Sequence, residues 1–118
     1  MPSRSFRNNN PGNLRASSWT RGLPGYVGQD DAGFARFSDL GLGLCAVVRL
    51  LRGSSYRDLS IREAIARYAP PVENDTHRYL DNVCQRSGLK PEQVIRDLTP
   101  AQLCELVAAM TIMEGWKA

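Results

Sequence analysis

The residue whose type and position most favour chemistry is Glu114, near the end of the last predicted helix. Thr99 can act as the N-cap of that helix, Pro100 suits its first position, and Gln102 completes a capping box. Apolar residues then recur at helical spacing, and Glu114 falls within about 40° of three of them on the helical wheel. The stripe consists of Leu103, Leu106, Val107, Met110 and Met113. The pattern therefore predicts a helix from 99 to about 116 with Glu114 on its buried face.

A carboxyl group at the end of an apolar stripe is poorly placed for a charge. Desolvation and the negative end of the helix dipole both favour its protonated form. A carboxyl that keeps its proton near neutral pH is what a general acid requires. On the helix alone, the alternative is that the last turn frays and Glu114 is an ordinary surface residue. Glu105 lies on the opposite face and has no such placement.

Three further carboxylates are candidates to assist Glu114. Asp30 and Asp31 stand at a predicted hairpin turn, and Glu73 follows a Pro-Pro pair. A retaining glycosidase needs a second carboxyl about 5–5.5 Å from the first, and an inverting one about 6.5–9.5 Å. The alternative roles are turn formation for the two aspartates and helix capping for Glu73. The single histidine, His77, has no Ser or Cys partner at a suggestive spacing and is expected to face solvent.

Side chains suited to binding a sugar gather in the N-terminal third. Asn8 to Asn13 form an Asn-, Pro- and Gly-rich segment, followed by Trp19 and Tyr26. Amide groups can hydrogen-bond sugar hydroxyls, and an indole ring can stack on a sugar face. Such segments are more often turns, because Asn and Gly tolerate positive φ and Asn side chains bond the nearby backbone.

The elements that must position these residues are a hairpin followed by about five helices. Two short aromatic-bearing runs, 25–29 and 34–37, flank an Asp/Gly turn and predict the hairpin. Helical periodicity and capping signals then predict five helices. They run from 40 to 53, from 61 until Pro70-Pro71, from the segment 73–76 to Gly88, from Pro91 through Ile95, and from 99. The expected fold is an α+β, mostly helical single domain over residues 1–118.

Composition is that of an ordinary globular protein, with 118 residues, 42% hydrophobic and 23% charged. The net charge of +3 and pI of about 9.0 suit anionic partners, but the basic residues are scattered, so nucleic-acid binding ranks low. Neither a signal peptide nor a membrane span is recognised, so synthesis in the cytoplasm is expected. Three cysteines in predicted helices argue against a disulfide framework or a zinc site, and free, buried thiols are expected; no cofactor or metal is indicated.

Several motifs together resemble a family of small phage and prophage proteins related to lysozyme-like muralytic domains. The family pattern reads roughly RNNNPGNIR, W-x-G, F-x-x-F, G-x-x-A and WAPP-x-EN-x-T-x-x-Y. Its counterparts here are Phe6–Arg15, Trp19, Phe34–Phe37, a Gly/Ala helix start, Tyr68–Thr76 and Tyr79. Tyr68 stands where Trp is more usual, and Leu44-Cys45-Ala46 where Ile-Arg-Ala is common, so a positive charge is missing there.

The resemblance implies a circularly permuted lysozyme-like fold. Lysozyme-like glucosaminidases and transglycosylases place the catalytic Glu at a helix end, before an Asn-rich loop and a hairpin. Here the loop and hairpin open the chain, and Ala108 to Trp116, with Glu114, closes it. If the chain is permuted, the end of the last helix must pack beside the loop at 8–13 and the hairpin. Glu114 is then the expected catalytic acid.

The implied activity is cleavage of the β-1,4 bond between N-acetylmuramic acid and N-acetylglucosamine in peptidoglycan, by a lysozyme or lytic transglycosylase. Glu114 would be catalytic, with Asp30 and Glu73 as possible assistants. The expected glycan contacts are Asn9, Asn10, Asn13, Trp19, Tyr26, Asn74, Thr76 and Tyr79. The protein would reach the cell wall after phage lysis or delivery by a partner, and an immunity protein could bind it. The alternative is a non-catalytic phage or effector structural module that binds glycan or a partner protein.

Overall fold

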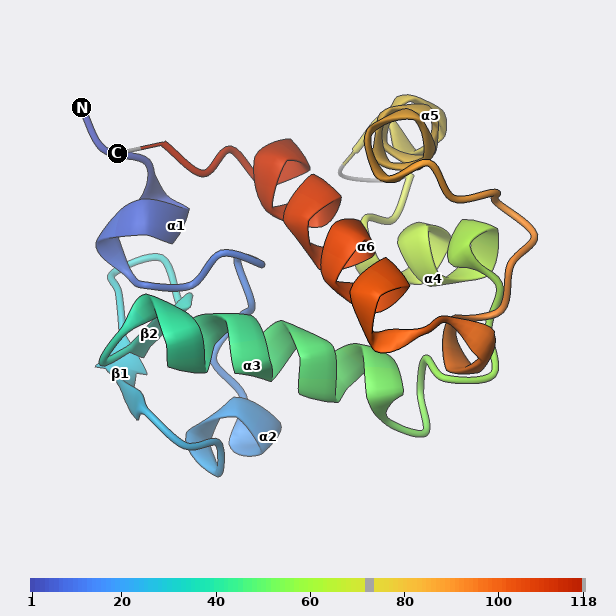
Figure 1. The fold of residues 1–118 in the computed structure, drawn as a ribbon. Coiled ribbons are helices and arrows are strands. Elements are labelled where there is room, and N and C mark those ends of the chain that lie inside the picture. The colour runs from blue at the N-terminus through green and yellow to red at the C-terminus, as the bar shows by residue number, and fades with distance from the viewer. Residues whose placement is uncertain (72–73, 118) are drawn as a thin grey trace. The chain divides into compact units, whose positions relative to one another are not determined.

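The computed structural model describes residues 1–71 and 74–117, and the chain has an α+β fold (Figure 1). Glu73, one of the expected assisting carboxylates, lies outside the described residues. A two-stranded antiparallel sheet is combined with six α-helices within the described part. The elements are α1 (Arg4–Arg7), α2 (Ser18–Arg21), β1 (Tyr26–Gln29), β2 (Ala35–Phe37), α3 (Leu40–Arg52), α4 (Ile61–Tyr68), α5 (Thr76–Ser87), the 3₁₀ turn η1 (Ile95–Asp97) and α6 (Pro100–Met113). None of these helices is long and apolar enough to cross a membrane.

The described residues form two compact units. Unit 1 contains residues 1–49 together with 114–118, and unit 2 contains residues 50–113. Unit 1 therefore holds α1, α2, the hairpin, most of α3 and the segment after α6, whereas unit 2 holds α4, α5, η1 and α6. The expectation of a single domain stays a prediction.

The hairpin and the starts of α3, α4 and α6 lie within about one residue of the predicted positions. The short helix predicted from Pro91 is wrong, because Val94 is extended and bridges Ser60, and the 3₁₀ turn η1 begins only at Ile95. Two capping boxes form as expected: Ser60 with Glu63 at the start of α4, and Thr99 with Gln102 at the start of α6. Gly88 ends α5 with a left-handed φ of 72°. These helix ends depend on residues within four positions of each other, which is why the sequence reveals them.

Two further features of the fold differ from the sequence-based expectation. The N-terminal third contains two one-turn helices, α1 and α2, each begun by a serine N-cap at Ser3 and Ser17. A single helical turn is too short to show a repeating apolar pattern, so periodicity could not predict these two helices. Their N-caps stabilise them instead. At the other end, α6 stops at Met113, and Gly115 follows with φ of 80°. Glu114 thus comes directly after the helix, and the prediction of a helix through Trp116 is wrong.

In unit 1 the hairpin gains a neighbour from the loop before it. The amide N–H of Ala35 donates to the Leu14 carbonyl at 2.9 Å, and Arg15 forms an isolated antiparallel bridge with Phe34. The register between β1 and β2 shifts between Tyr26 and Gly28, which is the mark of a bulge.

The three consecutive asparagines hold this loop to the hairpin. The Asn8 amide donates to Asp30, the Asn9 amide donates to the Phe37 carbonyl, and Asn10 is fully buried. The Asn10 amide donates to the carbonyls of Leu14 and Ala35, at 2.9 Å each, and its Oδ1 accepts from the Leu14 N–H at 3.0 Å. One buried side chain thus satisfies three backbone groups of two segments.

The start of α3 packs closely on the same loop, which explains a glycine. A Cβ placed on Gly43 would lie 2.0 Å from the Asn9 carbonyl oxygen and 2.9 Å from the Pro11 ring. No side chain fits there, so Gly43 lets the helix backbone approach the asparagine loop.

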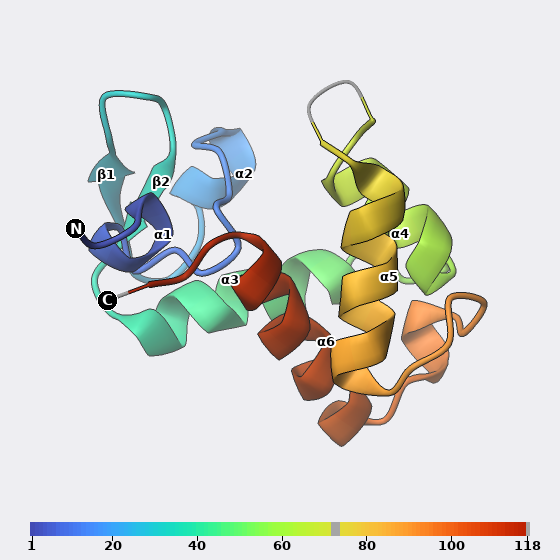
Figure 2. The same cartoon turned by 90° about the horizontal axis from the view of Figure 1, so that it is seen from above.

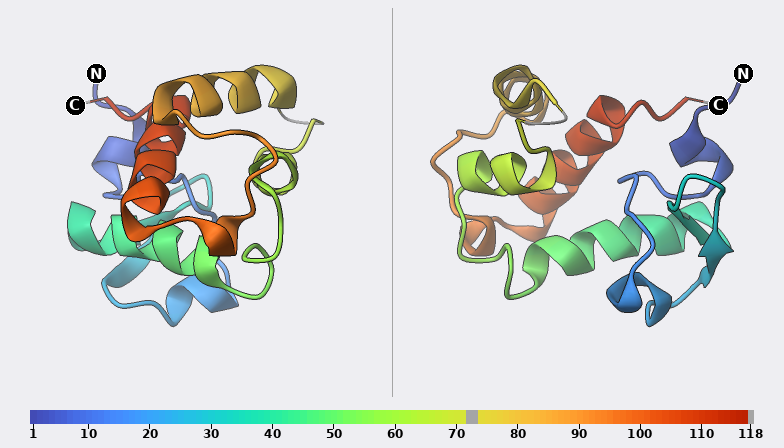
Figure 3. Two further views of the ribbon diagram at one scale, coloured as in Figure 1. Left: turned by 45° about the vertical axis from the view of Figure 1, so that its right-hand side comes forward. Right: turned by 180° about the vertical axis from the view of Figure 1, so that it is seen from behind.

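Unit 2 is a helical assembly in which α5 packs against both α4 and α6. Figure 3 shows α5, coloured yellow to orange, crossing the red-orange α6 in its left-hand view. The apolar stripes predicted from periodicity supply its buried residues, including Ile61, Ile65, Leu80, Val83, Leu103, Leu106, Val107 and Met110. The Ser60–Val94 bridge joins the start of α4 to the segment before η1.

The cysteines are free, as predicted, but they are not all buried. Cys45 and Cys104 are exposed, and Cys84 is half-buried. The expectation of buried thiols is wrong because Cys45 and Cys104 lie on the outward faces of α3 and α6, whose buried faces are filled by larger apolar residues.

Thiol reactivity should follow this exposure. Burial, and to a lesser degree the charge of Asp81, raises the pKa of the Cys84 thiol against the opposing effect of Arg62. Because the thiolate is the reactive form, we expect Cys84 to react most slowly with a thiol reagent in the folded protein at pH 8. All three should titrate after denaturation without reductant. Mass spectrometry of partly labelled protein measures the order, and a count of one free thiol would mean an internal disulfide.

Asn10→Asp should destabilise the protein severely. The new carboxylate would face two carbonyl oxygens that the Asn10 amide now satisfies, in a site without solvent access. We expect a loss on the order of 3 kcal/mol or more in the free energy of unfolding, measured by urea denaturation. Asn74→Asp, the same change at an exposed position, is the control and should be nearly neutral. A stability of Asn10→Asp equal to that of the control would contradict this account of the loop.

Candidate functional site

Glu114 lies against the asparagine-rich loop, as the sequence analysis predicted. The Asn13 amide donates to the main-chain oxygen of Glu114 at 3.0 Å and to its Oε1 at 3.4 Å. Asn13 itself adopts a left-handed φ of 49°, and its N–H donates to the Asn10 carbonyl. Glu114 is half-buried. The carboxyl group is therefore held at the end of α6 by a side chain 101 positions earlier in the chain.

The residues that follow Glu114 run alongside α1. Ser3 donates its N–H to the Lys117 carbonyl at 2.9 Å, and its hydroxyl accepts from the Lys117 N–H at 2.9 Å. The Phe6 and Trp116 rings meet edge to face, with centroids 5.2 Å apart. Figure 2 shows the red segment after α6 lying beside the blue α1. Residues 3 and 117 are thus neighbours.

One buried acceptor beside Glu114 has no partner in the described chain. The Oδ1 atom of Asn13 is shielded from solvent and makes no hydrogen bond to any described residue. Native proteins leave few such atoms, and each one needs an explanation. Here the atom belongs to the side chain that holds the candidate acid.

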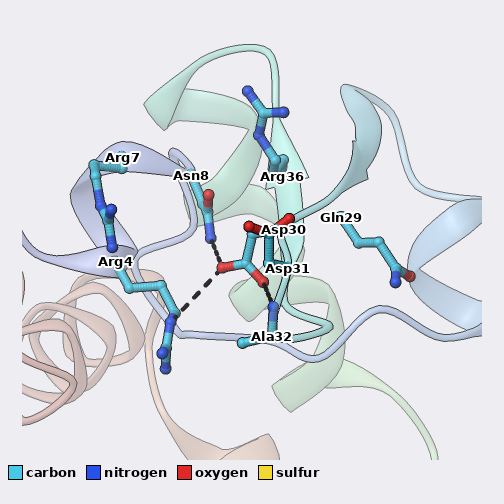
Figure 4. Close-up of a pocket in the computed structure, with 8 residues that line it drawn as sticks. All are labelled: Arg4, Arg7, Asn8, Gln29, Asp30, Asp31, Ala32 and Arg36. Atoms are coloured by element: carbon cyan, nitrogen blue, oxygen red, sulfur yellow. Dashed lines mark hydrogen bonds and ion pairs between the residues drawn. The ribbon is translucent and has the colours of Figure 1, made fainter.

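Asp30 joins α1, the asparagine loop and the hairpin turn (Figure 4). Its Oδ2 accepts from the Asn8 amide at 2.9 Å and lies 3.7 Å from the Arg4 Nε, and its Oδ1 accepts from the N–H groups of Ala32 and Phe34. Burial raises the pKa of Asp30, but the hydrogen bonds from Asn8, Phe34 and Ala32 and the charge of Arg4 outweigh it. The pKa is held below its usual 3.8, so Asp30 is ionised at neutral pH.

Of the other predicted glycan contacts of unit 1, one side chain is exposed and the others contact the protein itself. The Trp19 ring is 43% exposed on α2. Tyr26 is half-buried at the start of β1, where its ring meets the Phe37 ring edge to face. Asn9 and Asn10 are engaged by the backbone, and Asn10 has no exposed surface.

In unit 2, two of the predicted glycan contacts line one hollow. Asn74 and Tyr79 border a cavity of about 360 Å³ at the start of α5, with Arg78, Asn82 and Arg86 from the same helix and with Ile112 and Met113 from α6. Thr76 lines a different hollow, and its hydroxyl donates to the Ala69 carbonyl. The expectation that His77 faces solvent is confirmed, because its side chain is 83% exposed beside Asp81.

The sequence analysis did not identify the arginines near Asp30. Arg4, Arg7 and Arg36 line a polar hollow of about 410 Å³ with Asn8 and the hairpin turn. Arg4 and Arg7 are three positions apart on one helical turn, which places them on one side, but α1 was not foreseen. Arg36 joins them only through the pairing of β2 with the loop.

Comparison with known proteins associates the chain with bacteriophages. No protein-family model matches it. The chain is similar to Protein P5 of Pseudoalteromonas phage PM2, with 35% identity over 119 residues. The similarity covers 95% of this chain and 71% of the phage protein.

Asp30 should make the free energy of unfolding depend on pH in the acid range. The pKa of Asp30 in the folded protein lies below its unfolded value of 3.8. Its contribution to the free energy of unfolding is therefore complete above the unfolded pKa and is lost as the pH falls through the folded pKa. We therefore expect Asp30→Asn to be less stable than the parent at pH 7, and the gap to narrow below about pH 4. Urea denaturation at pH 7, 5, 4 and 3 measures it. Asp31→Asn, the same change at an exposed neighbour, should show no such convergence.

Proposed function

The chain belongs to the family of Protein P5 of Pseudoalteromonas phage PM2, and we propose that it is an enzyme that cleaves peptidoglycan. The substrate is the β-1,4 bond between N-acetylmuramic acid and N-acetylglucosamine. Glu114 is the general acid in a permuted lysozyme-like domain. Like its phage relative, the protein is associated with bacteriophages, and lysis or a delivery partner would bring it to the cell wall.

The observation that carries this proposal is the contact between Glu114 and Asn13. A catalytic Glu at a helix end, beside an Asn-rich loop that leads to a hairpin, is the arrangement that the resemblance to lysozyme-like domains implies. Here the Asn13 amide bonds Glu114, and Asn10 connects the same loop to β2. The hydrogen bonds between Ser3 and Lys117 are consistent with a permuted order of the same parts.

The chemistry asked of Glu114 is the transfer of a proton, first as an acid and then as a base. With the Asn13 amide at Oε1, the carboxyl would carry its proton on Oε2 and deliver it to the glycosidic oxygen as the bond to the muramic acid C1 breaks. The positive charge that develops on the sugar ring needs a partner. In a lytic transglycosylase the substrate's own N-acetyl group supplies it. The same Glu, now ionised, then takes the proton of the muramic acid C6 hydroxyl as that oxygen forms a bond to C1 and displaces the acetamido oxygen.

The engagement of Asp30 supports this mechanism with a single carboxylate. Both Asp30 oxygens accept hydrogen bonds from the chain, two from backbone N–H groups and one from Asn8. A nucleophilic role would break bonds that hold the hairpin turn. We therefore favour a transglycosylase-type reaction in which Glu114 acts alone.

Sugar recognition is proposed for the predicted contacts that are exposed or border a hollow; among them Tyr79 is only 4% exposed. The exposed Trp19 ring in unit 1 can stack on a sugar face. In unit 2, Asn74 and Tyr79 border a hollow with several polar side chains, which suits sugar hydroxyl and acetamido groups. The proposed contact of unit 1 and those of unit 2 can be tested by separate substitutions.

A non-catalytic module that binds glycan or a partner protein is the second candidate. The observation that favours it is the engagement of Asn8, Asn9 and Asn10 within the chain, because asparagines that stabilise the fold need no catalytic role. The same purified protein distinguishes the candidates, since a module would bind cell wall without releasing sugar fragments.

Glu114→Gln should abolish most of the activity. The change keeps the side chain's size and an oxygen for the Asn13 amide but removes the proton, so we expect a loss of at least roughly 10²- to 10⁴-fold in rate. The measurement is the loss of turbidity of purified peptidoglycan, with mass spectrometry of the muropeptides to distinguish anhydro from reducing ends.

Glu105→Gln is the matched control on α6. Glu105 is exposed, so its substitution should leave both rate and melting temperature almost unchanged. A fully active Glu114→Gln would show that the acid has been misidentified. A parent that binds cell wall but cleaves none, from any source, would leave the binding module as the function.

A further inference from the structure

The excess positive charge of this protein is concentrated in unit 1. Unit 1 has six arginines and one lysine against three aspartates and one glutamate, a net charge of +3. Unit 2 has seven arginines and one lysine against eight acidic residues, and its net charge is zero. The whole-chain value of +3 therefore belongs to unit 1, where cations outnumber acids nearly two to one.

Three of these arginines border the hollow of about 410 Å³ beside the hairpin turn. Figure 4 shows Arg4 and Arg7 on the α1 side of Asp30, and Arg36 on the strand side. The hollow is lined almost entirely by polar side chains, with Asn8, Gln29 and Asp31 completing it. Its size admits a small charged group rather than a folded partner.

The two acids of the hollow, Asp30 and Asp31, leave a positive balance because three arginines line it. Asp30 is saturated by the Asn8 amide, by two backbone N–H groups and by Arg4. Arg4 is oriented by the same contact and by the Phe34 ring, whose centroid lies 4.3 Å from its guanidinium carbon. A second guanidinium, that of Arg15, lies 4.6 Å from the same centroid. Asp30 and Phe34 thus fix Arg4 in place, and Asp30 offsets its charge, so the positive balance of the hollow comes from Arg7 and Arg36.

Arg7 and Arg36 remain available for a ligand. Both are exposed, and neither side chain makes a hydrogen bond or ion pair with any residue of the described ranges. A guanidinium offers paired N–H donors whose spacing matches the two oxygens of a carboxylate or phosphate. Two uncommitted guanidiniums and one pre-oriented guanidinium around one hollow form a site for an oxyanion.

We propose that this hollow binds an oxyanion of the cell wall, namely a carboxylate of the peptidoglycan stem peptides. The identity of the polymer rests on the proposed function. The glycan bond to be cleaved is uncharged, whereas each peptide stem carries carboxylates, so a cationic site on unit 1 would hold the peptides while the glycan is bound elsewhere. The hollow would then select peptide-bearing glycan over bare glycan.

The first test uses small anions and needs no enzymatic activity. The ¹⁵N-labelled full chain is titrated with sodium acetate and, separately, with sodium phosphate at constant ionic strength, and the arginine Nε–H resonances are followed by NMR. We expect saturable shifts for Arg7 and Arg36 and none for Arg21, an exposed arginine of unit 1 outside the hollow. Shifts that are equal at all arginines, or absent, would overturn the site even if the enzyme is active.

Charge substitutions sharpen this test. Arg7→Gln and Arg36→Gln should each weaken anion binding roughly three- to tenfold, and Arg21→Gln should not. Asp31 is exposed and lines the hollow, so Asp31→Asn should strengthen binding by removing a repulsive charge. Because the side chains of Arg7 and Arg36 hold no part of the described fold, all variants should melt like the parent. An unchanged affinity in both glutamine variants would refute the site.

The second test identifies the polymer. Pull-down with purified sacculi compares three preparations: untreated, treated with hydrofluoric acid to remove phosphate-linked polymers, and treated with an amidase to remove stem peptides. The double variant Arg7→Gln/Arg36→Gln should bind untreated and acid-treated sacculi about tenfold more weakly than the parent, and amidase-treated sacculi equally well. A defect that disappears after acid treatment would assign the site to wall phosphates and overturn the peptide carboxylate. A parent that binds anions but cleaves nothing would refute the proposed function alone.

Discussion

The hydrogen bonds of the buried Asn10 side chain are the constraint on which unit 1 depends. Unit 1 has a two-stranded sheet, two one-turn helices and most of α3, so less of it consists of packed helices than in unit 2. Asn10 compensates by bonding the backbone of the loop at Leu14 and of β2 at Ala35 from a position without solvent access. Such bonds are strong inside a protein, and losing one would leave a buried polar group unpaired. Asn8 and Asn9 extend the same connection to the hairpin turn and to Phe37.

The same loop holds the end of α6 through a different asparagine. The Asn13 N–H donates to the Asn10 carbonyl, and the Asn13 side-chain amide donates to the main-chain oxygen and the carboxyl of Glu114. A candidate acid on a frayed helix end would be free to move, whereas Glu114 is positioned by a loop that the Asn10 network makes rigid. Precise placement of a reacting group is a large part of catalysis, so a network that looks purely structural is also a means of positioning.

Polar networks also explain why two carboxyl groups of unit 1 are suited to different tasks. Asp30 accepts enough hydrogen bonds to remain ionised. Its contacts also connect α1 to the hairpin, because its carboxylate lies beside Arg4 of α1. Glu114 has the position expected of an acid. Around Asp30 the arginines remain available, so unit 1 combines the proposed catalytic carboxyl with the whole net positive charge of the protein.

The sequence by itself determined the elements whose signals are local. Capping boxes at Ser60 and Thr99, the αL glycine at 88 and the Asp/Gly turn of the hairpin act within four residues, and the structure contains each of them. The resemblance to lysozyme-like domains further implied that Glu114 lies beside the asparagine loop, and the contact of Glu114 with Asn13 agrees with it. Only the tertiary structure decided which groups each asparagine bonds, where α6 ends, which thiols are exposed and which arginines gather at Asp30. Those outcomes depend on contacts between residues far apart in the chain, such as Asn13 with Glu114, and periodicity and capping carry no information about such distant partners.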